Sequence, residues 1–364
     1  MTFPPAERLA RLRLARTEGV GPVSFRRLLD RFGSGERAAA ELPDLWRREG
    51  RALAPEALAE DEMAAADALG ARHVFAGEAD YPPLLAELAD CPPVLLVRGS
   101  PALARGALVG IVGARNASAA GRTLAARLAA DLGAAGFVVV SGMARGIDAA
   151  AHEGALATGT IACVAGGPDV AYPSENAALQ EAIAETGLIV SEMPPGTAPQ
   201  ARHFPRRNRL IAGLVEGLVV IEAALGSGSL ITARLAGEAG RDVMAVPGHP
   251  LDPRARGGNG LIRSGATLVE DATDVLATLR PFAVAGAGVR EPVATPVAAP
   301  ADDADTTPED AAERVAALLS PVPVAVDSIV RASGLPAARV AAILTELELA
   351  GSLVRHSGGR VAAA

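Results

Sequence analysis

The residues best suited to chemistry form a basic run between positions 202 and 209, which reads Arg-His-Phe-Pro-Arg-Arg-Asn-Arg. This run contains no acidic residue, whereas a solvated charged surface normally mixes both signs. Guanidinium groups hold phosphate oxygens in a planar, forked geometry, and Phe204 offers a ring on which a base can stack. The run therefore predicts a phosphate site that contains Phe204, Arg206, Arg207, Asn208 and Arg209.

Three further segments offer backbone amides or a cation to an anion. The run Ser-Gly-Met-Ala-Arg-Gly at 141–146 precedes a predicted helix, where glycines let the backbone fold over a phosphate at the positive end of the helix dipole. Arg115 follows a separate apolar run, and the small residues at 227–229 open another helix as a backbone nest. Together these segments predict a polyanion site with contacts from Arg115, Ser141, Gly142, Arg145, Gly146, Ser227, Gly228 and Ser229.

Short apolar runs alternate with amphipathic stretches between residues 107 and 280. Every candidate segment either follows one of the apolar runs or stands at the beginning of an amphipathic stretch. The pattern predicts strands at 107–112, 137–141, 160–165, 188–191, 217–222 and 243–246. It predicts helices at 118–135, 147–158, 174–186, 206–214 and 229–240, with Ser118 and Ser174 as caps. Such alternation favours a Rossmann-like, mostly parallel sheet with helices on both faces. Ligands of these sheets bind beyond the carboxyl ends of the strands, so the candidate residues should gather at one edge.

The rest of the chain divides into two smaller units and a tether. Residues 6–70 have helical periodicity around a Gly-Val-Gly turn, which resembles a helix-hairpin-helix; a plain helical turn is the alternative. Residues 308–364 read as three short helices and a hairpin, which resembles a winged helix. From about 280 to 307, between the core and the winged helix, alternating Pro, Ala and acidic residues are typical of a semi-extended tether. The predicted domains are a helical domain at 1–75, a core at 76–280, a linker at 281–307 and a winged helix at 308–364.

The composition excludes several classes of protein. All 34 basic residues are arginine, so a P-loop ATPase, a protein kinase or a lysine-dependent Schiff-base enzyme is excluded. Two cysteines are too few for a thiolate metal cluster, no dinucleotide fingerprint occurs, and we expect neither a metal nor a cofactor. With no secretory signal and no run of 18 apolar residues, a cytoplasmic protein without membrane contact is expected. The net charge of −8 still permits a local arginine patch that binds phosphates.

Seven motifs occur in the order typical of the DNA-processing protein A family (DprA/Smf), which this sequence resembles. They cover most of residues 90 to 280, and as an ordered set they are far more specific than any one alone. The sequence departs from the family in lacking lysine, so basic contacts must come from arginine. The motifs lie at 111–115, 141–152, 172–176, 204–209, 222–224, 227–233 and 246–248.

The resemblance implies a role without catalysis. A member of this family would bind and protect incoming single-stranded DNA during natural transformation, load the RecA recombinase for homologous recombination, and form a homodimer through its core. One alternative is a nucleoside-monophosphate glycosidic hydrolase of a related Rossmann-like fold, with Glu192 or Glu222 as its carboxylate. Another is a nucleotide sensor, which would bind mononucleotides tightly without affinity for oligonucleotides.

Overall fold

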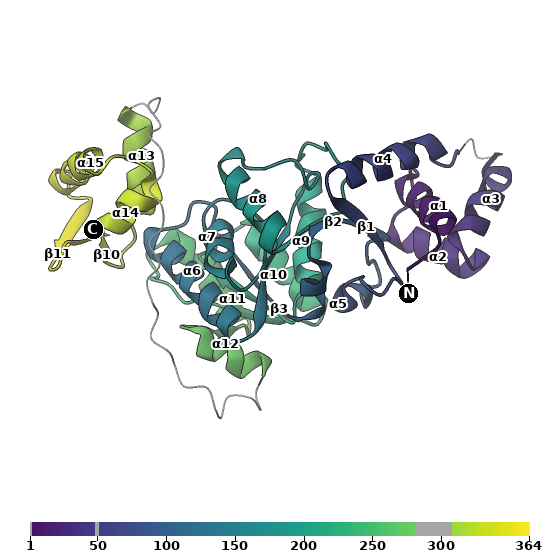
Figure 1. The fold of residues 1–364 in the computed structure, drawn as a ribbon. Helices are drawn as coiled ribbons and strands as arrows, with labels where there is room; N and C mark the ends of the chain where they lie inside the picture. The colour runs from purple at the N-terminus through teal and green to yellow at the C-terminus, as the bar shows by residue number, and fades with distance from the viewer. Residues whose placement is uncertain (1, 48–50, 281–307) are drawn as a thin grey trace.

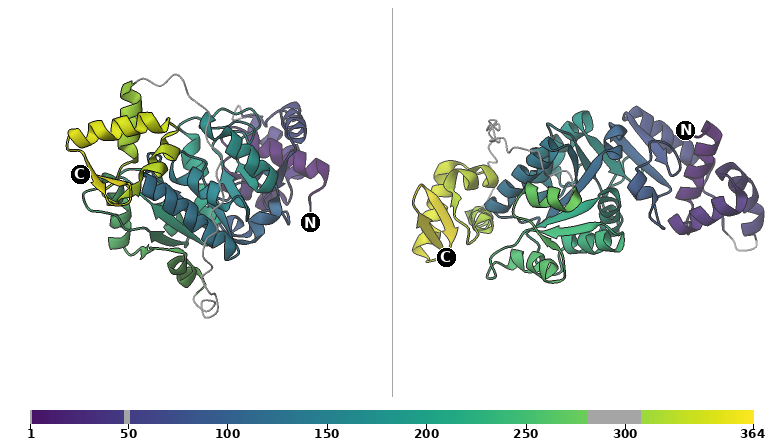
Figure 2. Two further views of the ribbon diagram at one scale, coloured as in Figure 1. Left: turned by 60° about the vertical axis from the view of Figure 1, so that its left-hand side comes forward. Right: turned by 90° about the horizontal axis from the view of Figure 1, so that it is seen from below.

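The computed structural model describes residues 2–47, 51–280 and 308–364, which form three units in a row (Figure 1). The views in Figure 2 agree that the large α/β unit lies between the helical N-terminal unit and the small C-terminal unit. The linker that we predict at 281–307 lies outside the described residues.

The N-terminal unit consists of four helices: α1 (Pro5–Arg16), α2 (Pro22–Phe32), α3 (Gly35–Trp46) and α4 (Glu56–Ala68). The connection between α1 and α2 contains Gly19, whose φ of +75° is a conformation that glycine adopts without strain. Pro22 then opens α2 at a position where a missing N–H costs nothing. The predicted pair of helices around a glycine turn is confirmed. Its apolar faces meet in a core of Leu14, Phe25, Phe32, Leu42 and Trp46.

The central sheet has nine strands in the order β1-β2-β6-β5-β4-β3-β7-β8-β9. Neighbouring strands from β6 to β9 are parallel, and β2 is antiparallel to both β1 and β6. The six predicted strands and the mostly parallel sheet are confirmed, and three strands at the sheet edges were not predicted. The bounds are β1 (Ala71–Phe75), β2 (Val94–Gly99), β3 (Ala107–Gly113), β4 (Phe137–Ser141), β5 (Thr160–Cys163), β6 (Leu188–Ser191), β7 (Gly217–Ile221), β8 (Asp242–Ala245) and β9 (Thr267–Leu268).

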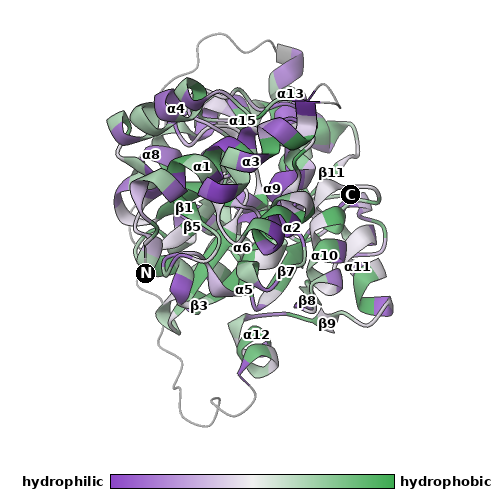
Figure 3. Ribbon diagram, turned by 90° about the vertical axis from the view of Figure 1, so that its right-hand side faces the viewer, coloured by the Kyte–Doolittle hydropathy of each residue, from purple (hydrophilic) through white to green (hydrophobic). Residues whose placement is uncertain are grey.

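Both faces of the sheet are covered by helices, because alternate residues of each strand point to opposite sides. In β3, Val109 and Ile111 join a core with α6 (Ala119–Ala134), α7 (Ile147–Ala155) and α12 (Ala272–Leu279). Leu108 and Val112 join the other core, with α9 (His203–Leu214) and α10 (Gly228–Glu238). Figure 3 shows the strands mostly in the hydrophobic colour and hydrophilic turns on the surrounding helices. The remaining helical segments are α5 (Pro83–Ala86), η2 (Pro101–Arg105), η3 (Ser174–Asn176), α8 (Ala177–Thr186), η4 (Pro253–Ala255) and α11 (Arg256–Arg263).

The two predicted caps have different outcomes. Ser118 caps α6 as predicted, because its side chain accepts a hydrogen bond from the Gly121 amide at 2.9 Å. Ser174 does not cap a helix. It lies inside the 3₁₀ turn η3, and α8 begins only at Ala177.

The C-terminal unit has the predicted winged-helix arrangement. Three helices, α13 (Pro308–Leu318), α14 (Val326–Ser333) and α15 (Ala337–Leu349), pack on a small sheet. Its strand order is β10-β12-β11, with β10 (Val324–Ala325), β11 (Leu353–His356) and β12 (Arg360–Ala363). In the part of the chain that the structure describes, no helix combines the length and apolar character needed to cross a membrane.

A candidate nucleic-acid site beyond the strand ends

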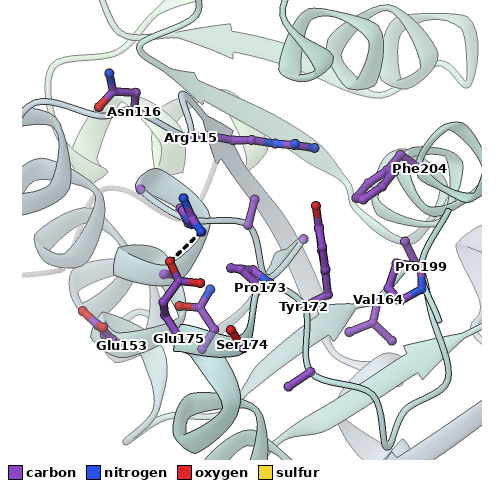
Figure 4. Close-up of a pocket in the computed structure, with 18 of the residues that line it drawn as sticks. Arg115, Asn116, Glu153, Val164, Tyr172, Pro173, Ser174, Glu175, Pro199 and Phe204 are labelled. Atoms are coloured by element: carbon purple, nitrogen blue, oxygen red, sulfur yellow. Dashed lines mark ion pairs between the residues drawn. The ribbon is translucent and has the colours of Figure 1, made fainter. Parts of the chain in front are cut away.

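A pocket of about 920 Å³ lies beyond the carboxyl ends of β3, β4 and β5. The loops after these three strands and the start of α9 supply most of its lining, as the parallel sheet predicts. In Figure 4, Arg115, Tyr172 and Phe204 point toward a common space. Six of the predicted contact residues line the pocket: Arg115, Gly142, Arg145, Gly146, Phe204 and Arg207.

Two aromatic rings and two guanidinium groups meet in this pocket. The rings of Tyr172 and Phe204 are tilted by 60° with their centroids 5.8 Å apart. The Cζ atoms of Arg115 and Arg207 lie 5.2 and 5.8 Å from the Phe204 ring centroid. Tyr172 is 52% exposed, so its ring is available to a ligand. Tyr172 belongs to the motif at 172–176 but was not predicted as a contact. Its pairing with Phe204 joins residues that are far apart in the chain, so no local pattern indicates it.

The loop after β4 approaches its neighbours so closely that only glycine fits at two positions. A Cβ at position 142 would overlap the guanidinium of Arg207. Gly146 has φ +78°, and a Cβ there would meet the carbonyl of Ala114. Ser141 is buried, and its hydroxyl donates to the carbonyl of Ile111 at 2.6 Å, which ties β4 to β3. The glycines thus shape the pocket wall, and Ser141 stabilises the strands behind it.

Arg207 is the buried centre of this wall. Its Nη1 lies 3.5 Å from Oδ2 of Asp148, and both side chains are only 6% exposed. Burial raises the pKa of the Asp148 carboxyl, while the Arg207 charge opposes that shift. The pair therefore anchors the start of α7 to α9. Nearby, burial lowers the pKa of His152 to about 3, and its Nδ1 lies 2.8 Å from the Thr160 hydroxyl.

The other members of the basic run have separate environments. Arg206 is exposed, as a phosphate contact requires. Arg209 instead lies between two carboxylates, with Nη2 3.0 Å from Glu192 and Nη1 2.8 Å from Asp90. The amide of Asn208, which is buried, donates to the carbonyl of Gly228 at 3.4 Å. Both residues therefore hold α9 to its neighbours. The partners, two carboxylates for Arg209 and a backbone carbonyl for Asn208, lie outside the basic run and could not be seen in it.

The residues at 227–229 begin α10 outside this pocket. Ser227 stands at the N-cap position, and its hydroxyl lies 2.9 Å from that of Ser229. Of the described residues that line the pocket, none comes from 227–229, so the structure does not bring this predicted nest together with Arg115 and Phe204.

The two carboxylates considered for hydrolysis are engaged with protein groups. Glu222, at φ +50°, accepts hydrogen bonds from the amide of Ser118 at 2.8 Å and from the Ser118 hydroxyl. It lies beside the start of α6, next to the point between β3 and β7 where the strand order reverses. Glu192 contacts Arg209, and burial raises the pKa of the Glu192 carboxyl.

Several lining residues were not predicted as contacts. Arg122 follows Ser118 by one helical turn, so the predicted helix start was a signal for it. Glu175 lines the pocket and pairs with Arg145 at 2.7 Å on the surface. Arg314 belongs to the C-terminal unit, and only the docking of that unit brings it here. Across the described ranges, no group of three or more His, Cys, Asp or Glu is placed to hold a metal ion.

The fold and this site together define a class. The chain is a Rossmann-like α/β protein with a helix-hairpin-helix unit before the sheet, a winged helix after it and a cationic, aromatic pocket at the strand ends.

Family models match three consecutive stretches of the sequence. They are described as a DprA-like N-terminal HHH domain at residues 5–65, DNA recombination-mediator protein A at 72–280 and a DprA winged helix domain at 299–359. The second stretch alone covers more than half of the chain. The chain therefore belongs to the DNA recombination-mediator protein A family.

Individual relatives agree with this assignment. The DNA processing protein DprA of Bacillus subtilis (strain 168) is 44% identical over 202 residues, which cover 55% of this chain and 68% of that protein. Protein Smf of Escherichia coli (strain K12) is 36% identical over 287 residues, or 77% and 74% of the two chains.

Two solved structures are similar as well. DNA processing protein A from Streptococcus pneumoniae aligns with a TM-score of 0.66 at 33% identity, over 77% of this chain and 99% of that one. DNA processing protein A from Helicobacter pylori, studied for its single-stranded DNA binding mode, aligns with a TM-score of 0.53 at 30% identity, over 57% and 95%.

Proposed function

We propose that this protein binds single-stranded DNA in the pocket beyond β3, β4 and β5, and that it acts in natural transformation without catalysis. The observation that carries the proposal is the Tyr172–Phe204 pair flanked by the guanidinium groups of Arg115 and Arg207. Aromatic faces stack on bases of any sequence, and the guanidinium fork of Arg115 can hold a phosphate between them. Arg207 is buried against Asp148 and supports the Phe204 ring from behind. The single-stranded DNA binding studied in the Helicobacter pylori relative supports this ligand.

The same pocket favours a single strand over a duplex. Bases inside a duplex are stacked on both faces, so their rings are not available to Tyr172 or Phe204. A single strand can place a base against the rings while its phosphates reach Arg115 and Arg145 in the pocket lining. Exposed Arg206 lies beside the pocket, next to Arg207, where the strand would leave it.

The experiment is a fluorescence titration of a labelled oligonucleotide at several salt concentrations. With about four phosphate contacts, the slope of log K against log salt should be near −3, and each lost contact should flatten it by about 0.7. We expect Arg115→Ala and Arg206→Ala each to weaken binding and flatten the slope. The control is Arg234→Ala, which removes an exposed arginine of α10 that pairs with Glu238. If the double variant Arg115→Ala/Arg206→Ala has the affinity and slope of the control, the site is wrong.

We also propose that the protein works in the cytoplasm as a homodimer, protects incoming DNA and loads RecA onto it. The core exposes four large apolar side chains within one stretch of the chain, which a second copy could cover: Leu225, Ile231, Leu251 and Leu268. Sedimentation should show a dimer that Leu251→Glu weakens. RecA assembly on protein-bound single-stranded DNA tests the loading step directly.

A further inference from the structure

One side of the candidate DNA pocket is formed by the C-terminal unit. Arg314, Ala317 and Leu318 of α13 and Ala332 of α14 line the pocket together with the core residues. The two units belong to one chain but are separated by the stretch at 281–307. The pocket is therefore a composite of the core and the winged helix.

Specific contacts hold the C-terminal unit at this place. Arg254 of η4 donates to the carbonyls of Ala317 and Leu319, at 2.7 and 2.5 Å. These carbonyls lie at the C-terminal end of α13, where the helix itself leaves acceptors without partners and where a positive charge is favourable. Asp252 orients the guanidinium of Arg254 with Oδ2 at 3.0 Å from its Nη2. Ala119 of α6 is buried in the apolar cluster of the C-terminal unit.

The docked position brings two cations toward each other across the junction. Arg122 of α6 is partly buried, and its Nε has no hydrogen-bond partner among the described residues. Burial and the charge of Arg314 lower the pKa of Arg122, and Glu153 opposes the shift. Arg314 is exposed, and its guanidinium lies beside Gly334 at the C-terminal end of α14: a Cβ added to that glycine would be 3.5 Å from Nη2 of Arg314. Like charges in such an arrangement are stabilised by an anion between them.

We propose that a backbone phosphate of the bound single strand lies between Arg122 and Arg314, so that the core and the winged helix hold the DNA jointly. This proposal rests on the proposed function, because it assigns a further contact within the same pocket. Its consequence is reciprocal coupling: docking of the C-terminal unit strengthens DNA binding, and DNA strengthens docking.

The test uses the full chain and a fluorescence titration over a range of salt concentrations. Arg314→Ala should flatten the salt slope by about 0.7, which corresponds to about fivefold weaker binding at 0.1 M salt. Arg254→Ala should have the same effect, because it releases α13 and carries Arg314 away from the pocket. The double variant should bind no more weakly than Arg254→Ala alone. The matched control is Arg355→Ala, which removes an exposed arginine from β11 that pairs with Glu348 and does not line the pocket.

The outcomes separate this proposal from the one on which it rests. If the unaltered chain does not bind single-stranded DNA, the proposed function fails. If it binds, but Arg314→Ala behaves like Arg355→Ala, the shared phosphate is refuted while the proposed function stands. If the effects of Arg254→Ala and Arg314→Ala add, docking does not position Arg314 and the coupling is refuted.

Discussion

Replacing Arg207 by methionine should destabilise the core by about 3–5 kcal/mol, because Asp148 would stay buried without its cation. Both side chains are 6% exposed, and only backbone donors would remain for the carboxylate: the amide of Ala144 at 3.3 Å and that of Gly113. Burial already raises the pKa of Asp148, and losing the opposing charge raises it further. A raised carboxyl pKa means that the folded state binds more protons than the unfolded one. The variant should therefore lose stability as the pH rises above the ordinary Asp pKa.

Two further variants separate this effect from a general loss of charge. Asp148→Asn in the Arg207→Met background removes the buried charge and should recover at least about 1 kcal/mol. Arg206→Met changes the neighbouring exposed residue and should alter stability by no more than about 0.5 kcal/mol. Sequence alone treats Arg206 and Arg207 as equivalent, so the difference between them tests the tertiary structure.

The assay is hydrogen exchange of the backbone amides in β3 and β4, read as opening free energies at pH 6 and pH 8. The single tryptophan, Trp46, lies in the N-terminal unit and does not report on this core. An Arg207→Met variant that is no less stable than Arg206→Met would refute the reasoning, as would a double variant no more stable than Arg207→Met alone.

Three more predictions follow from the structure. Burial lowers the pKa of His152 from 6.5 to about 3, so the unfolded chain binds one more proton than the folded chain between these two pH values, and stability should fall by about 1.4 kcal/mol for each pH unit toward acid. In acid unfolding, His152→Asn should remove this contribution to the slope, whereas His249→Asn, at an exposed position, should not. A chain ending at Arg280 should stay folded and dimeric and bind single-stranded DNA within about tenfold of the full chain, some 1.4 kcal/mol, by fluorescence titration; a loss of several hundredfold would mean that the C-terminal unit holds most of the DNA. Nucleoside monophosphates should stay intact with or without magnesium; free base or phosphate released by the full chain but not by Glu222→Ala would contradict the proposal of a role without catalysis.

Local sequence patterns determined how strands and helices alternate along the chain between residues 107 and 246. The strand at 137–141 was predicted to the residue, and the helix at 118–135 to within one residue, because apolar periodicity and the Ser118 cap act over a few positions. The edge strands β1, β2 and β9 were not predicted. Their pairing depends on partners elsewhere in the chain, such as β6 for β2.

The same division applies to the site. The sequence alone placed Arg115, Gly142, Arg145 and Phe204 at one sheet edge, because parallel strands bring their carboxyl ends together. Only the tertiary structure decided which arginine charges remain available. Arg209 pairs with Asp90 and Glu192, and Arg207 pairs with Asp148, although the partners are 17 to 119 residues apart along the chain. Charge compensation depends on distance and burial in space, and neither is encoded in a run of neighbouring residues.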